Sequence, residues 1–493
     1  MDEAASESFA SNEAKYILSF TLYLSRFVGF VENTLKVPFY HVLLETILIL
    51  WIIRLLATKS YTPREQRLKL SKEEEEALIQ EWEPEPLVPK TGIDDYIVKP
   101  KIVNGKAGIR MNVNGKDCLN LATFNFLGFV GRKEIEDQAI DTLRKYGVGS
   151  CGPRGFYGSI DVHLHLEEKI ASYLGTEEAA LYSYGFSTIA SVIPAYSKRT
   201  DVIFCDDGVG FAIQKGIIAS RSKVYWFRHN DMMDLERILK EQEERDIKNP
   251  KKAKSTRRFL VVEGIYANYG DIAPLPKLVE LKNRYKVRIV VEETMSFGVL
   301  GRHGKGITEH YGIPVEEVDL ITVSLETSLA TIGGFSAGSS FIVDHQRLSG
   351  QGYVFSASLP PLLATAANSA LDIMSKHPEM FGRTQKNASL LRDELKGITG
   401  LSVEGDLISP IIHLRLIKEN SEKSRQEQER ILQKIVDEAL EDGVALTLAR
   451  YLNDQELHLP SASIRITVNS ELSSEDITES AEKIKLAAKN VLV

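Results

Sequence analysis

The stretch VRIVVEETMSFG, residues 287–298, places carboxylates and hydroxyls directly behind a continuous apolar run. A run of β-branched residues without polar alternation is typical of a strand that is buried on both faces of a parallel sheet. Proteins built on such sheets place their chemistry at the carboxyl ends of the strands. This stretch therefore predicts the fold class, and it indicates the edge of the sheet at which a site is expected.

Similar apolar runs recur on either side of this stretch and alternate with helical patterns such as PLPKLVELKNRY (274–285). The alternation predicts an α/β domain with a mostly parallel sheet that is covered by helices. The other expected strands are EAALYS (178–183), DVIFCD (201–206), KVYWF (223–227), RRFLVVEG (257–264), DLITVS (319–324) and SSFIVD (339–344).

Changes of pattern divide the 493 residues into four expected parts. Residues 1–58 are an interfacial and transmembrane anchor, and residues 59–99, which mix a charge run with prolines, are a linker or arm. Residues 100–365 form the large α/β domain. Residues 366–493, in which a long polar helix lies between two short apolar strands, form a smaller α+β domain.

Charge and cysteine content exclude some classes of function. A net charge of −8 argues against a nucleic-acid partner, because such a face needs clustered Lys and Arg. The one basic cluster, KNPKKAKSTRR (248–258), is expected to be a solvated loop. Three separated cysteines without a CxxC pair indicate neither a disulfide framework nor a zinc site, so no metal is expected, and Cys118 and Cys205 are expected to be core residues.

The stretch VPFYHVLLETILILWII (37–53) contains a single charge, Glu45, and is long enough to span a bilayer. A buried or re-entrant helix is the alternative. Basic residues crowd its carboxyl side, which places the bulk of the chain in the cytosol by the positive-inside rule. The preceding segment, residues 16–35, has aromatic and leucine residues at a helical period, which predicts a helix in the membrane interface or a second packing helix.

The stretch SLETSLATIGG (324–334) follows a predicted strand but contains no lysine, histidine or cysteine. With six other segments in the same order, it resembles the α-oxoamine synthase family, fold type I enzymes that use pyridoxal phosphate. The resemblance extends from about Pro100 to the end and implies a large domain like that of pyridoxal-phosphate transferases. The other segments are NLATFNFLGF (120–129), YGVGSCGPRGFYGSIDVHLHLEE (146–168), FRHND (227–231), EGIYANYGDIAPL (263–275), VEETMSFGVLGRHGKG (291–306) and FSASLPP (355–361).

In that family an aspartate keeps the cofactor's pyridine nitrogen protonated, two histidines lie near the ring, and a lysine holds the cofactor covalently. The resemblance assigns the aspartate position to Glu292, the histidine positions to Met295 and Gly210, and the lysine position to Thr327. Threonine cannot hold the cofactor covalently, and methionine cannot donate a hydrogen bond. We therefore expect a degenerate cofactor pocket and no catalytic residue on this chain.

A family member with a degenerate pocket and a membrane segment is expected to be the non-catalytic subunit of a heterodimer. The resemblance implies a catalytic partner that holds pyridoxal phosphate on its own lysine. It also implies condensation of L-serine with palmitoyl-CoA to 3-ketodihydrosphingosine at the endoplasmic reticulum membrane. A small activating subunit and an ORM-type regulator are further expected partners. Active sites of this family lie at the dimer interface, so this chain can contribute residues to its partner.

Four residues are the expected contributions to the partner's active site. Cys151 lies in the glycine-rich loop GSCGPRG, where backbone can approach closely, although a plain interface residue is the alternative. Arg154 in the same loop suits a carboxylate or phosphate, or equally a structural ion pair. Ser356 and Ser358 match the segment from which a family partner contributes a hydroxyl to the cofactor phosphate, and Ala357 leaves open which serine does so.

Other polar residues in these segments are expected to be structural. His163 and Glu167 match a family helix and are interpreted as packing or interface residues. His229 and Asp231 are expected to fix a turn. Arg465 aligns with the arginine that binds the substrate carboxylate in the family, and beside a degenerate pocket it is expected to be a structural remnant.

Two other functions are compatible with these residues. One is a self-sufficient pyridoxal phosphate acyltransferase that uses a displaced lysine, either Lys305 in GRHGKG or Lys215 in AIQKG. This alternative needs a new geometry for the cofactor, and catalytic constellations tolerate little misplacement. The other is a membrane scaffold that binds partners without sharing an active site.

Overall fold

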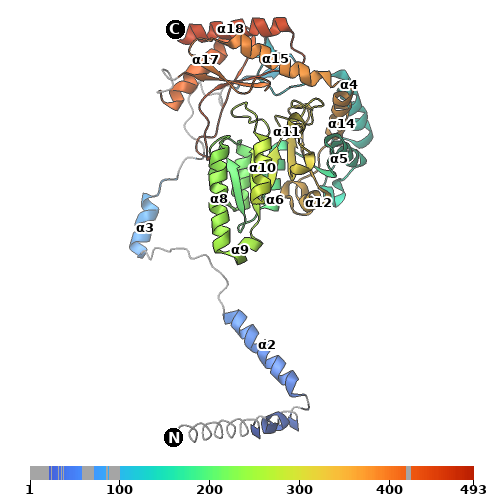
Figure 1. The fold of residues 1–493 in the computed structure, drawn as a ribbon, viewed down its shortest axis with the longest axis vertical. Helices are drawn as coiled ribbons and strands as arrows, with labels where there is room; N and C mark the ends of the chain where they lie inside the picture. The colour runs from blue at the N-terminus through green and yellow to red at the C-terminus, as the bar shows by residue number, and fades with distance from the viewer. Residues whose placement is uncertain are drawn as a thin grey trace. The chain divides into compact units, whose positions relative to one another are not determined.

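The computed structural model describes residues 22–23, 25–30, 33–34, 36, 38–57, 71–84, 87, 100–417 and 423–492. The chain divides into two compact units, Met1–Gly92 and Ile93–Val493. Figure 1 shows helices α2 and α3 of the first unit in blue and the globular second unit in cyan to red.

The amino-terminal unit contains the candidate membrane helix α2 (Phe39–Ala57). Its segment Tyr40–Ala57 has a mean hydropathy of 1.8 and no residue buried by protein, so it is long and apolar enough to cross a bilayer. The helix therefore continues past the predicted end at Ile53. Of the predicted interfacial segment 16–35, residues 22–23, 25–30 and 33–34 are helical, and the rest lie outside the described residues.

The predicted arm contains a helix, α3 (Lys72–Glu81), where the sequence patterns predicted only a linker or surface arm. Ser71 and Glu74 form a reciprocal cap, because the Glu74 N–H donates to the Ser71 hydroxyl at 3.2 Å and the Ser71 N–H donates to the Glu74 carboxylate at 2.8 Å. Such a capping box satisfies two amide donors at the helix start. Residues 59–70, 85–86 and 88–99 of the predicted arm lie outside the described residues.

The globular unit is built on a seven-stranded sheet, with helices on both sides (Figure 1). Five neighbouring strands are parallel, which confirms the predicted mostly parallel sheet. The side chains of β5, β7, β8 and β9 are almost entirely buried, as expected for continuous β-branched runs, whereas the edge strand β6 is buried only at Phe227. In spatial order the strands are β4 (Glu178–Tyr182), β10 (Gly334–Gly338), β9 (Leu320–Ser324), β8 (Arg288–Glu292), β7 (Arg258–Glu263), β5 (Val202–Asp206) and β6 (Lys223–Phe227).

One predicted strand is wrong, because SSFIVD lies in helix α12 (Ser340–Ser349). The strand at this place is β10, made of GFSAG, which pairs antiparallel with both β9 and β4. Its residues are mostly small and give no continuous apolar run, so hydropathy patterns did not predict a strand here. In α12 the residues Ile342, Val343 and Gln346 are buried, and this spacing places them on one helical face.

Helices surround the sheet and bury its two faces in one continuous apolar core. The element bounds are α4 (Lys133–Tyr146), α5 (Asp161–Leu174), α6 (Gly185–Tyr196), α7 (Phe211–Ser220), α8 (Met232–Lys248), α9 (Pro250–Ser255), α10 (Leu275–Tyr285), α11 (Ile307–Tyr311), α13 (Gln351–Val354) and α14 (Pro361–Lys376), with short turns η1 (Arg154–Gly158) and η2 (Val315–Glu317).

A second apolar core lies under the carboxyl-terminal helices, which Figure 1 shows in orange and red at the top. Its antiparallel sheet has the order β11 (Leu401–Glu404), β12 (Ile411–Leu416), β15 (Ile464–Thr467) and β14 (Thr447–Leu448). Three helices cover it: α15 (Glu379–Leu395), α17 (Arg425–Glu441) and α18 (Ser474–Leu492). A further sheet has the order β1 (Val103–Asn104), β2 (Arg110–Val113), β3 (Lys116–Asn120) and β13 (Val444–Ala445).

Candidate functional site

The carboxyl ends of the parallel strands bring several acidic side chains to one edge of the sheet. Asp206, Glu263 and Glu292 end β5, β7 and β8, and all three are buried. Burial raises the pKa of Glu263 to about 7. Burial, and then the nearby Glu263 carboxylate, raise the pKa of Glu292 well above its usual range. Burial at this edge therefore favours the protonated forms of Glu263 and Glu292.

Glu292 and Thr327, two residues of the predicted degenerate pocket, belong to one hydrogen-bond network. Thr294 links them: its N–H and its hydroxyl both donate to the Glu292 carboxylate, the N–H at 3.2 Å. The Thr327 hydroxyl donates to the Thr294 carbonyl at 2.7 Å. The Ser324 N–H donates to the Thr294 hydroxyl at 2.8 Å. Thr327 is 1% exposed, so its side chain ties two strand ends together in the interior.

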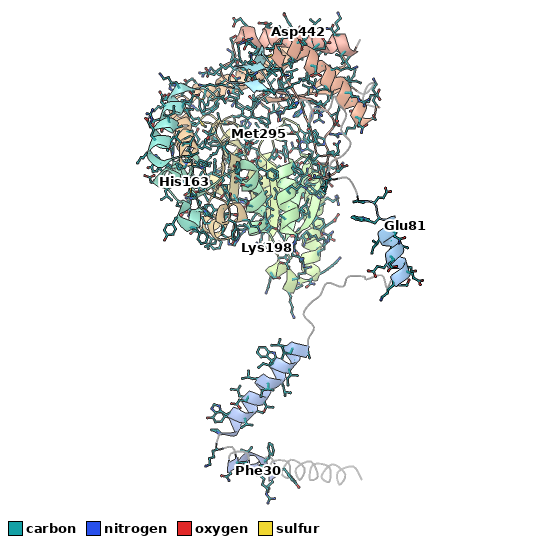
Figure 2. The ribbon with its side chains drawn as sticks, turned by 180° about the vertical axis from the view of Figure 1, so that it is seen from behind. Phe30, Glu81, His163, Lys198, Met295 and Asp442 are labelled. Carbon is teal, nitrogen blue, oxygen red and sulfur yellow. The ribbon has the colours of Figure 1, made fainter. Side chains whose placement is uncertain are left out.

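Gly210 and Met295 occupy the positions of the family's two histidines, and both contact other residues of this chain. The Gly210 N–H donates to Glu263 at 2.5 Å, and a Cβ added at Gly210 would lie 3.3 Å from the same carboxylate oxygen. Met295 is buried among the apolar residues of the large core, and Figure 2 shows it near the centre of the globular unit.

His229 has a role at this edge beyond the turn that its sequence context predicted. Its ring bridges Asp206 at 2.8 Å and Asp271 at 2.9 Å, and it stacks on Tyr269 with ring centroids 4.2 Å apart. Burial lowers the pKa of His229, but the hydrogen bonds to the two aspartates outweigh it and raise the pKa to about 10. Asp231 caps α8 as a turn residue, whereas His229 joins the end of β5 to the loop that follows β7.

These residues do not fit pyridoxal phosphate in the manner of the family. The lysine position holds a buried threonine whose hydroxyl is engaged, and Glu292 is bonded to Thr294. Of the two displaced lysines, the Lys215 ammonium lies 3.4 Å from the Gln455 side-chain oxygen and 4.7 Å from the Phe211 ring centroid. At Lys305 the backbone N–H, and not the side-chain ammonium, donates to the Glu309 carboxylate at 3.1 Å. Within the described residues, no group of three or more metal-ligating side chains occurs.

Arg465, which aligns with the arginine that binds the substrate carboxylate in the family, also contacts neighbouring residues of this chain. Its guanidinium lies 4.0 Å from the centroid of the Phe124 ring and donates to the Ala122 carbonyl at 3.2 Å. Burial lowers its pKa to about 10. This environment is consistent with the predicted structural remnant.

The residues predicted to reach the partner gather at a second place, which we call the loop hollow. It is an open hollow of about 350 Å³ between the loop of Cys151 and the segment after α13. Cys151 is exposed and has a left-handed backbone with φ of 58°. The lining residues are Gly149, Ser150, Cys151, Ser183, Tyr184, Ile332, Ser356, Ala357, Ser358, Pro360 and Leu363.

Ser356 and Ser358 differ in what their side chains contact. The buried Ser358 hydroxyl donates to the carbonyls of Gly152 and Gly158, and its N–H donates to the Gly152 carbonyl at 3.0 Å. Ser358 therefore fastens the glycine-rich loop. Ser356 is half-buried, and in the described part of the chain its hydroxyl has no hydrogen-bond partner.

A buried ion pair fixes the glycine-rich loop that contains Cys151. Arg154 and Glu167 form two parallel hydrogen bonds of 2.7 and 2.8 Å, and both residues are buried. The Leu181 N–H also donates to Glu167, at 2.9 Å. His163, labelled in Figure 2, is fully buried, and its Nε2 lies 2.6 Å from the Leu359 carbonyl. Arg154 thus makes the structural ion pair that was one of its two alternatives, and His163 and Glu167 are packing residues.

Exposed apolar side chains lie in the segments that surround the loop hollow. Tyr157 is fully exposed and Phe355 is 79% exposed, although monomeric proteins rarely leave such rings in solvent as a group. Further exposed apolar residues of these segments are Val148, Phe156, Tyr184, Phe186 and Ile332. This surface has the composition of a protein interface.

Comparisons with known proteins agree with this arrangement. The model of the family aminotransferase class I and II matches residues 116–484. Long chain base biosynthesis protein 1b of Oryza sativa subsp. japonica is 44% identical over 92% of this chain and 92% of its own length. Serine palmitoyltransferase 1 of Dictyostelium discoideum is 45% identical over 90% of this chain and 93% of its own length.

The fold is also found among solved structures. A high-resolution structure of SPT with the PLP internal aldimine superposes with a TM-score of 0.70 at 23% identity, and the match covers 79% of this chain and 92% of that one. The family resemblance and the fold class predicted from the sequence are therefore confirmed.

Proposed function

Because this chain belongs to the aminotransferase class I and II family, in the group of long chain base biosynthesis protein 1 and serine palmitoyltransferase 1, we propose that it is the non-catalytic subunit of a serine palmitoyltransferase. Its partner is a lysine-bearing long-chain-base 2 subunit. Together they condense L-serine with palmitoyl-CoA to 3-ketodihydrosphingosine in sphingolipid synthesis.

One observation carries this proposal: the lysine position is Thr327, whose buried hydroxyl is bonded to Thr294. Pyridoxal phosphate is therefore held covalently by the partner alone, where it supplies the electron sink that the condensation needs. In the degenerate pocket of this chain the polar groups bond to one another, whereas the loop hollow is open. The loop hollow and the exposed apolar residues of its surrounding segments support a shared site at the subunit interface.

Each of the predicted contributing residues has a distinct role in this proposal. Ser356 supplies the hydroxyl to the partner's cofactor phosphate, because its hydroxyl has no hydrogen-bond partner in the described chain, whereas the Ser358 hydroxyl donates to two carbonyls. Cys151 brings the loop backbone close to the shared site. Arg154 contributes indirectly, because it fixes the loop through Glu167.

The chain is anchored by α2 in the endoplasmic reticulum membrane, with the globular unit in the cytosol. The apolar length of α2 and the basic residues that follow it support this orientation. A small activating subunit and an ORM-type regulator complete the complex in this proposal.

Purification of three samples tests the proposal: this chain alone, the partner alone, and both co-expressed. Turnover of L-serine and palmitoyl-CoA is expected only for the co-expressed pair. A chain that forms 3-ketodihydrosphingosine alone would support the displaced-lysine enzyme instead. A partner whose turnover is the same with and without this chain would support the scaffold.

A further inference from the structure

The amino edge of the large sheet, opposite the edge described above, carries a dense group of positive charges. The segment from Ile247 to Arg258, which includes α9, contains six Lys and Arg residues and no Asp or Glu. This occurs in a chain whose net charge is −8. Figure 2 shows Lys198 at the end of the globular unit away from Asp442, and Figure 1 shows α9 at that same end.

Backbone pairing brings three basic segments together at this edge. Val202 of β5 pairs with Lys223 of β6 and with Arg258 of β7. The hydroxyls of Ser197 and Ser222 are 2.6 Å apart, so the loops before β5 and β6 touch. We call the group the basic edge. Its members are Lys198, Arg199, Arg221, Lys223, Lys248, Lys251, Lys252 and Lys254.

The acidic residues of this edge do not neutralise the lysines. Asp201 and Asp246 pair with Arg257 and Arg258 at 2.8 and 2.5 Å. Within the described part of the chain, no carboxylate pairs with Lys248, Lys251, Lys252 or Lys254. The exposed Glu243 and Glu244 lie about one turn before Lys248 on α8, which leaves α9 and its flanks positive.

An exposed apolar side chain lies among these charges. Ile247 is 73% exposed at the last turn of α8, next to Lys248 and three residues before α9. Lysines around an isolated apolar residue suit a lipid headgroup layer, where ammonium groups meet phosphates and the apolar side chain enters the acyl boundary.

We propose that the basic edge docks on an anionic membrane surface, with Ile247 entering the interface. This inference rests on the proposed membrane anchoring by α2, because the anchor holds the globular unit within reach of a bilayer and raises the effective concentration of its surface. Each Lys or Arg near an anionic bilayer strengthens partitioning about fivefold. Several weak contacts thus suffice for a tethered domain.

The test uses the full chain with its partner in lipid nanodiscs of phosphatidylcholine, alone or with about a third of it replaced by phosphatidylserine. Acetylation rates of individual lysines are measured by mass spectrometry. We expect Lys248, Lys251, Lys252 and Lys254 to react at least about threefold more slowly in the anionic discs, and we expect about 0.5 M salt to remove the difference. The exposed Lys386, Lys434 and Lys489 of the carboxyl-terminal lobe serve as internal controls.

Two variants complete the experiment. The first is a triple variant that should abolish the protection of Lys248 and Lys198; it combines Lys251→Glu, Lys252→Glu and Lys254→Glu. The second is a control triple variant that should leave this protection intact; it combines Lys386→Glu, Lys434→Glu and Lys489→Glu. Equal rates in both lipids would overturn the proposal. Protection that needs the partner but not the anionic lipid would also overturn it, in favour of an acidic protein surface. Incorporation of the chain into the discs reports on the anchor. Turnover of the complex reports separately on the proposed function.

Discussion

The degenerate pocket around Thr327 and the loop hollow differ in how their polar groups are used. In the pocket, Thr327, Thr294 and Glu292 bond to one another in the interior. At the loop hollow, Cys151 is exposed and the Ser356 hydroxyl has no hydrogen-bond partner in the described chain, whereas Ser358 holds the loop through two carbonyls. The polar groups of the pocket are thus satisfied within this chain, whereas the loop hollow is open, as the proposed shared site requires.

The largest expected effect concerns the support of the loop hollow. Arg154→Ala should lower the free energy of unfolding by about 3–5 kcal/mol, because it leaves the buried Glu167 carboxylate without its partner. Thermal and denaturant unfolding measure this change. Arg284→Ala, which removes an exposed ion pair with Glu236, is the control and should cost below about 1 kcal/mol. Similar losses for both variants would mean that the loop is not fastened by this pair.

The next effect separates catalysis from folding. Cys151→Trp should lower the turnover of the complex about 100-fold, because a bulky ring displaces a loop of the proposed shared site, and a misplacement of about 1 Å can cost on the order of 100-fold in rate. Its melting temperature should change little, since Cys151 is exposed. Cys151→Ser keeps the size and should retain most activity. Normal turnover by an assembled Cys151→Trp complex would show that the loop hollow is not part of the shared site.

The stability of the chain should depend on pH through His229, which lies at the same edge of the sheet as the degenerate pocket. The pKa of His229 is raised to about 10 in the folded chain, so its stabilising contribution is complete below its unfolded pKa of about 6.5 and is lost as pH rises through 10. Stability should fall by at most about 1.4 kcal/mol per pH unit in this window. His229→Gln should flatten the curve between pH 7 and 10, and an unchanged slope would show that His229 is not a cation.

The smallest effect distinguishes the two serines. Ser358→Ala should destabilise the chain by about 1 kcal/mol, because it removes a buried donor to the carbonyls of Gly152 and Gly158. Ser356→Ala should leave unfolding unchanged and raise the cofactor concentration that half-saturates the complex. The reverse pattern would assign the cofactor contact to Ser358.

Sequence patterns predicted the parts of the fold whose signal is local. The runs at β5, β7 and β8 are continuous and β-branched, so their strands and burial followed directly. β10 was missed because GFSAG has no hydropathy signal and becomes a strand only through pairing on both sides. The helix α3 was missed because its charge run concealed the cap formed by Ser71 and Glu74.

The site could be predicted in part for the same reason. Residue types alone indicated that Thr327 and Met295 cannot perform the family's chemistry. The role of His229 depends on Asp206 and Asp271, which are 23 and 42 positions away. The assignment of Ser358 depends on carbonyls about 200 positions away, at Gly158 and Gly152. Such contacts exist only in the folded chain.

The central claim is that the complex holds its cofactor on the partner and not on this chain. Borohydride reduction of the purified complex, followed by peptide mapping, tests it most directly. We predict a phosphopyridoxyl-lysine on the partner alone, and we predict that Thr327→Lys adds none to this chain, because Glu292, Met295 and Gly210 still surround that position. A modified lysine on the natural chain, at Lys215, Lys305 or elsewhere, would contradict the account.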